Sequence, residues 1–168
     1  VRPGGTINFH ARDPAGSLNV DRSVSFGIAR IGLPDVDMMF STVQVRNRTV
    51  PATAYASGCG WPVTTSVTIP ANWPSGLYYA VFGNDANACT VPFVVAPVQK
   101  TAAAKVMVQI PVTTAQAYNG YGGKSLYTYH SSGGIAAPKV SFDRPFDDPW
   151  NYALSLIHIS EPTRPLYI

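Results

Sequence analysis

The clearest strand signal in the chain is Val24-Ser25-Phe26-Gly27-Ile28-Ala29-Arg30-Ile31, where larger apolar residues alternate with small or polar ones. Because successive side chains of a strand point to opposite faces, Val24, Phe26 and Ile28 are expected to face the same side. A glycine, a proline and an aspartate follow within residues 32–35 and would end the strand. The stretch therefore predicts one half-buried strand of a β-sheet.

Short segments of the same kind recur from the N-terminus to about residue 96. They are Thr6–His10, Thr42–Arg46, Val63–Ile69, Leu77–Phe82 and Val91–Ala96. In the third of these, Val63, Val67 and Ile69 are expected to point inward. Turn residues separate the segments, and no helical period is visible among them. The pattern predicts a mainly β fold, with an immunoglobulin-like β-sandwich over residues 1–97.

The character of the chain changes after a linker at residues 98–104. Lys105–Ile110 is typical of a buried strand, and a polar, glycine-rich loop is expected from Thr113 to Lys124. An open α/β sheet begins in this way, with ligands gathering beyond the carboxyl end of the strand. Residues 105–153 are therefore predicted to be the truncated start of an α/β domain.

The C-terminal segment needs a separate interpretation. Leu154–Arg164 matches, residue for residue, one reading frame of a transposase adapter used in sequencing-library preparation. Eleven consecutive matches do not arise by chance. We therefore expect residues 154–168 to be a non-native tail, with the natural sequence cut near Ala153, and leave the tail out of fold reasoning.

Charge and hydropathy exclude two classes of partner. Charged residues make up 12% of the chain, the net charge is +3, and the arginines are scattered rather than grouped into a basic stripe. Such a pattern does not form a nucleic-acid groove. No segment reaches the roughly 20 apolar residues that span a bilayer. We expect neither a nucleic acid nor a membrane as partner, and the sequence leaves an oligomer open.

The cysteines bear on the compartment. Cys59 and Cys89 lie in turn-like sequence and would close a loop of about 30 residues, worth about 3–4 kcal/mol as a disulfide. The alternative is two buried thiols in a cytosolic protein. The turn-like context favours the disulfide and therefore an exported or periplasmic protein; without it, the protein would be cytoplasmic.

Tyrosines are dense in the second region. Tyr118, Tyr121, Tyr127 and Tyr129 fall within twelve positions, among several glycines. One interpretation is aromatic packing of a loop. The other is that phenol groups face a pocket, where phenolate oxygen is a hard ligand suited to ferric iron.

Two further patterns contain residue types that can bind a phosphate or form ion pairs. Gly123-Lys124-Ser125 ends like a phosphate-binding loop, but Tyr118 stands where that loop needs its first glycine. Asp143–Asp148 places three acids around Arg144. Arg144 is then either paired with a neighbouring acid in a solvated loop or placed at the rim of a pocket.

Three segments, taken together, carry a family resemblance. They are Ile69-Pro70-Ala71-Asn72-Trp73-Pro74-Ser75-Gly76-Leu77-Tyr78, Thr114-Ala115-Gln116-Ala117-Tyr118-Asn119-Gly120-Tyr121-Gly122-Gly123-Lys124-Ser125-Leu126-Tyr127 and Val140-Ser141-Phe142-Asp143-Arg144-Pro145-Phe146. In order and spacing they resemble the large (beta) subunit of bacterial N,N-dimethylformamidase and its relatives. The resemblance implies a β-sandwich joined to an α/β domain like that of glutamine amidotransferases. It also implies hydrolysis of the C–N bond of small amides, with iron held by two tyrosines and a glutamate.

Carried onto this chain, the resemblance implies that Tyr118, in Gln-Ala-Tyr-Asn, is the best candidate metal ligand and that Tyr121 is next. Asn119 and Arg144 are the candidate catalytic residues. Phe146 stands where relatives often have a tyrosine, and Ala115 stands where they often have a tryptophan. The glutamate would lie beyond Ala153, so iron is expected in the full-length protein and not in this fragment.

Three hypotheses follow. The chain is a fragment, itself inactive, of a bacterial amidohydrolase whose substrate is a small-molecule amide. Alternatively, it is a non-catalytic secreted β-sandwich module that binds carbohydrate or protein, with Trp61, Trp73, Tyr78 and Tyr79 stacking on sugars. In the third hypothesis the amidotransferase-like domain keeps its fold and has lost its metal, as Phe146 would allow.

Overall fold

The computed structural model describes residues 1–32, 36–83, 88–98 and 110–147. The chain falls into two compact units. The first comprises Val1–Thr49 and Gly60–Val106, and the second comprises Val50–Cys59 and Met107–Ile168. Residues 50–59 thus group with the second unit, whereas the sequence placed them within its first domain.

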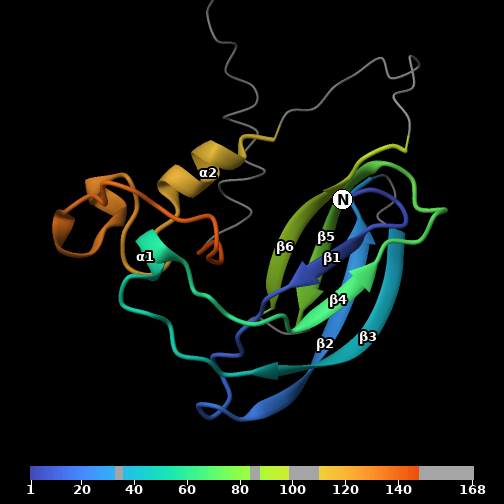
Figure 1. The fold of residues 1–168 in the computed structure, drawn as a ribbon, viewed down its shortest axis with the longest axis horizontal. Helices are drawn as coiled ribbons and strands as arrows, with labels where there is room; N and C mark the ends of the chain where they lie inside the picture. Colours follow the sequence, from blue (N-terminus) through green and yellow to red (C-terminus); the bar gives the residue numbers. More distant parts are fainter. Residues whose placement is uncertain (33–35, 84–87, 99–109, 148–168) are drawn as a thin grey trace, which may run out of the picture. The chain divides into compact units, whose positions relative to one another are not determined.

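The first unit consists of two antiparallel sheets (Figure 1). The smaller pairs β1 (Thr6–Phe9) with β4 (Thr65–Thr68). The larger has the order β3 (Val36–Arg46), β2 (Asp21–Arg30), β5 (Gly76–Phe82), β6 (Cys89–Val95). The prediction of a mainly β chain is confirmed, and each strand predicted within residues 1–97 overlaps an observed one. β2 and β3 begin earlier than predicted, at Asp21 and Val36.

Both sheets contribute to one hydrophobic core. Phe26 and Ile28 are each 1% exposed, and Val24 packs against the same cluster, as the alternation in the second strand predicts. Phe9, from the smaller sheet, meets Phe26 edge-on with ring centroids 5.5 Å apart. Edge-to-face contacts of this kind stabilise an aromatic core beyond the area they bury.

One inward residue was predicted wrongly. Val67 and Ile69 are buried, but Val63 is largely exposed because β4 begins only at Thr65. The limit comes from the partner strand, since Phe9 is the last residue of β1 and pairs with Thr65.

The second unit contains four short helical elements: α1 (Ala54–Ser57), α2 (Val112–Tyr118), η1 (Thr128–His130) and η2 (Ser132–Gly134). The predicted loop from Thr113 to Lys124 is wrong over its first half, which is helical. Two buried residues, Ala115 and Gln116, anchor α2. With seven residues the helix is too short to show a hydrophobic period, and its burial decides its structure instead.

Several predictions fall outside the described residues. They are the strand at Lys105–Ile110 apart from its last residue, the linker apart from Val98, and the tail at 154–168. The immunoglobulin-like layout and the amidotransferase-like domain stay predictions. Within the described ranges, no helix has the length and apolar character needed to cross a membrane.

Candidate functional site

The candidate site is built at the C-terminal end of α2, within the second unit. Asn119 follows the helix directly, and its side chain is completely buried. Its amide nitrogen donates to the carbonyl oxygen of Pro145 at 2.8 Å and to Oε1 of Gln116 at 3.3 Å. Its Oδ1 accepts from the backbone N–H of Tyr121 at 3.0 Å and of Asp147 at 3.2 Å. Asn119 therefore ties the end of α2 to the segment around residue 146.

Arg144 makes a second tie between the same segments. Its guanidinium donates to four backbone carbonyls, those of Gln116 (3.1 Å), Tyr121 (2.6 Å), Lys124 (3.0 Å) and Ser141 (3.1 Å). The side chain is 6% exposed, and this burial lowers the pKa of Arg144, an effect that the nearby Asp147 opposes. A guanidinium has five N–H donors, so four of them are committed to the main chain.

These contacts bear on the predicted catalytic roles of Asn119 and Arg144. The polar atoms of both side chains form hydrogen bonds that hold residues 116–124 against residues 141–147. The catalytic role stays a prediction, whereas the geometry gives both residues a positioning role. Neither alternative weighed for Arg144 describes its place, because it is buried among carbonyls.

Two serines that the sequence did not single out fix the position of Tyr127. Ser125 is fully buried, and its Oγ bonds with both the N–H and the carbonyl of Tyr127 at 3.0 Å. Ser131 Oγ donates to the Tyr127 carbonyl at 2.7 Å and accepts from the Ser125 N–H at 3.0 Å. The next amide, Leu126 N–H, bonds to the carbonyl of Ala117 at 3.0 Å, beside the end of α2.

This arrangement stacks Tyr127 on Tyr118. Their ring centroids are 4.4 Å apart with an interplanar angle of 21°. The neighbouring Tyr118 side chain raises the pKa of Tyr127. Tyr129 and His130 lie next to this pair, with centroids 6.2 and 6.5 Å from Tyr118. We call these four rings the aromatic cluster.

The predicted ligands Tyr118 and Tyr121 are thus part of one framework. The main chain of Tyr121 bonds to Asn119 and Arg144, and Tyr118 presents its ring to the aromatic cluster. Among the described residues, no three His, Cys, Asp or Glu side chains gather as a metal site. The side chains that this part of the chain does bring together are the rings of the aromatic cluster.

The sequence contained a weak signal for Tyr127 but none for its position. Gly122 and Gly123, with φ of +81° and +96°, reverse the chain so that Tyr127 returns to α2. A Cβ at Gly122 would lie 2.7 Å from the backbone nitrogen of Tyr55 in α1, which leaves no room for a side chain. Glycine is required at this close approach.

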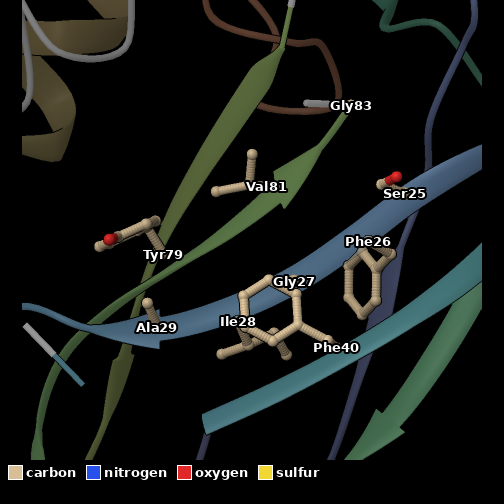
Figure 2. Close-up of a pocket in the computed structure, with 9 residues that line it drawn as sticks. All are labelled: Ser25, Phe26, Gly27, Ile28, Ala29, Phe40, Tyr79, Val81 and Gly83. Atoms are coloured by element: carbon tan, nitrogen blue, oxygen red, sulfur yellow. The ribbon is translucent and has the colours of Figure 1, made fainter. Parts of the chain in front are cut away.

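The rings invoked for sugar binding behave differently from the aromatic cluster. Trp61, Trp73 and Tyr78 are buried in the first unit, with Trp73 stacked on Tyr78 at 5.2 Å, and cannot stack on a ligand. Tyr79 lines a pocket of about 290 Å³ on the larger sheet, where the exposed Phe40 ring lies over Gly27 (Figure 2). Its lining is mostly apolar, which does not suit a sugar.

The predicted disulfide is wrong, because no disulfide joins Cys59 and Cys89. Cys59 belongs to the second unit, where its N–H bonds to the Asp143 carbonyl at 2.7 Å. Cys89 begins β6 in the first unit, opposite Phe82. Each cysteine is placed by its own unit, so the preference for an exported protein loses its argument.

The comparisons with known proteins gave one match. No curated protein and no solved structure matches the chain. The matching family model is described as N,N-dimethylformamidase beta subunit-like, C-terminal, and covers residues 32–160. Its range includes the end of α2, the serines, the aromatic cluster and Arg144, and the assignment of residues 154–168 to an adapter stays a prediction. With more than half of its residues matched, the chain belongs to the N,N-dimethylformamidase beta subunit-like family.

Proposed function

We propose that the protein carrying this chain is a hydrolase of the C–N bond in small amides and that iron is held at the aromatic cluster. The observation that carries the proposal is the placement of Tyr118. It lies in the Gln-Ala-Tyr-Asn segment of a chain that belongs to the dimethylformamidase-like family, and its ring is stacked on that of a second tyrosine, Tyr127.

The donor set of the cluster supports iron as the metal. Phenol oxygens become hard anionic ligands when they lose their protons, and hard ligands suit a ferric ion. When bound, iron would polarise an amide carbonyl and lower the pKa of a bound water.

The surrounding residues would hold the cluster rigid. Asn119 and Arg144 fix the end of α2 through eight hydrogen bonds in all, four from each side chain. A site whose ligands are held by buried bonds needs little reorganisation when it binds a metal. In this proposal the first unit has an immunoglobulin-like layout and the second is amidotransferase-like.

The test measures iron content and release of dimethylamine from N,N-dimethylformamide. We expect the unsubstituted full-length protein to bind iron and hydrolyse the amide, and its Tyr118→Phe variant to lose both. Tyr55→Phe is the matched control, since it removes a phenol from α1 in the same unit. A protein that binds no iron and releases no amine would refute the proposal, as would a Tyr118→Phe variant that behaves like the control.

A further inference from the structure

Asn119 and Gly120 form an Asn-Gly pair, the dipeptide in which an asparagine side chain loses ammonia most readily. The backbone nitrogen of the second residue attacks the side-chain carbonyl carbon of the first, and a glycine has no Cβ to hinder the approach. We propose that Asn119-Gly120 is a concealed deamidation site and that the carboxylate of Asp147 keeps it closed. The inference is independent of the proposed iron site, because it concerns covalent chemistry of the chain itself.

The reaction needs no partner other than water. The Gly120 nitrogen loses its proton and bonds to Cγ of Asn119, and the side-chain nitrogen of Asn119 leaves with that proton as ammonia. A five-membered succinimide ring remains. Water then opens the ring at one of its two carbonyls, which gives either aspartate or isoaspartate at position 119. Each product carries a negative charge where the asparagine side chain is neutral.

The close approach of Asp147 explains why a glycine stands at this vulnerable position. A Cβ at residue 120 would lie 2.9 Å from Oδ2 of Asp147 and 3.1 Å from the carbonyl oxygen of His130. The same Oδ2 accepts a hydrogen bond from the Gly120 N–H at 2.9 Å. The carboxylate that excludes a side chain from residue 120 therefore also engages the nitrogen that would attack Asn119.

Asn119 is held in a conformation that does not allow the ring to close. Its ψ of 117° turns the Gly120 nitrogen towards Hα of Asn119 and away from the side chain that it would attack. The side chain itself is 0% exposed and makes the four hydrogen bonds described above. Ring closure must rotate the peptide between the two residues, which breaks the bond to Asp147. Deamidation therefore requires this part of the chain to open locally.

Deamidation would also break the contacts that conceal the site. The amide nitrogen of Asn119 donates to the Pro145 carbonyl and to Oε1 of Gln116. A carboxylate has no proton to donate, so the oxygen that replaces this nitrogen would face two acceptors in a fully buried position. A buried charge facing acceptors is strongly destabilising. One reaction at Asn119 would therefore release the end of α2 irreversibly.

The experiment incubates the full chain at mildly alkaline pH, folded and in urea, and measures aspartate and isoaspartate at each asparagine by peptide mass spectrometry. In urea we expect Asn119 to react faster than Asn72, which is followed by a tryptophan. In the folded chain we expect the reaction at Asn119 to be at least about tenfold slower than in urea, the effect of a single hydrogen bond to a charged group.

Variants test the role of Asp147. Asp147→Ala should speed deamidation of folded Asn119 by at least about tenfold, because it removes the bond to the Gly120 N–H. The control is Asp143→Ala, which removes an exposed acid from the same segment. In urea all three chains should react alike, since Asp147 protects only the folded state. Circular dichroism checks that each variant is folded, and Asp147→Asn, which keeps an acceptor without the charge, should give an intermediate rate.

Each outcome supports or overturns a part of the proposal. Acceleration confined to folded chains that lack the Asp147 carboxylate supports it. Equal rates at Asn119 in the folded chain and in urea would show that the site is not concealed. Equal rates in folded Asp147→Ala and Asp143→Ala would overturn the role of Asp147. Asn119→Asp imitates one product and should speed hydrogen exchange of the Tyr121 amide, whose unchanged exchange would show that deamidation leaves the end of α2 in place.

Discussion

Replacing Arg144 by methionine should unlock the whole end of α2. The substitution keeps most of the buried stem and removes the donors to four carbonyls. A buried acceptor without a donor costs about 1–3 kcal/mol, and at the low end four of them give about 4 kcal/mol. The variant no longer buries a charged guanidinium, which makes the net loss of stability smaller. Taking about 1 kcal/mol for each carbonyl already allows for water that reaches some of them.

The effect is local and is best measured by hydrogen exchange. We expect the amides of Tyr121 and Leu126, both bonded within the same framework, to exchange about a thousandfold faster, since every 1.4 kcal/mol is a factor of ten. The exchange rate in Arg144→Lys should lie between those of the unsubstituted protein and of Arg144→Met, because an ammonium keeps the charge but cannot donate to four carbonyls at once. Lys139→Met is the control, as Lys139 is exposed in the same unit. If the amides in Arg144→Met exchange at rates within tenfold of that control, the four hydrogen bonds of Arg144 do not hold the end of α2 in place.

Three further predictions concern stability. Gly122→Ala should lose about 2–4 kcal/mol by chemical denaturation, because it adds a contact with the α1 backbone to the cost of a positive φ. Gly123→Ala has a similar φ and would make only an ordinary contact, with Ser132 Oγ at 3.5 Å, so it isolates the conformational part. Equal losses in the two variants would disprove the contact with α1. Burial alone would raise the pKa of Asp13, but the hydrogen bonds and the charge of Arg22 outweigh it, so the pKa is lowered. The stabilisation from Asp13 is therefore present above the unfolded pKa and is lost as pH falls below about 4. Asp13→Asn should flatten the acid limb of a stability–pH curve, and an unchanged limb would contradict the assignment to Asp13. Burial raises the pKa of Tyr78, so its contribution to stability is present below about pH 10 and is lost above it. Tyr78→Phe should remove this loss of stability at alkaline pH, and it should cost about 1 kcal/mol at neutral pH because the hydrogen bond to the Pro74 carbonyl is lost. If stability still falls at alkaline pH in Tyr78→Phe, another group causes the fall.

The strands were predictable because their pattern is local. Alternation in the second strand identified Phe26 and Ile28 as core residues, and the sheet confirms both. The error at Val63 was not local, since the limit of β4 is set by where β1 ends. The same holds for α2, whose seven residues are helical because Ala115 and Gln116 are buried by segments far along the chain.

The density of tyrosines was visible in the sequence, but their packing was not. The rings of Tyr118 and Tyr127 are stacked, and their role as metal ligands stays a prediction. The partners of Arg144 lie up to 28 residues away and are main-chain carbonyls, which carry no sequence signal. The acids close to Arg144 in the sequence suggested an ion pair because they are visible there, whereas the carbonyls to which its guanidinium donates are not.

Phe146 has no side-chain oxygen, yet hydrogen bonds fix the main chain on both sides of it. Asn119 binds the carbonyl of Pro145 and the N–H of Asp147, so the residue between them is fixed by both of its neighbours. The fully buried amide of Asn119 places residues 116–121 against residues 145–147 through four hydrogen bonds. The position of residue 146 is therefore set by the hydrogen bonds of its two neighbours and does not depend on an oxygen in its own side chain.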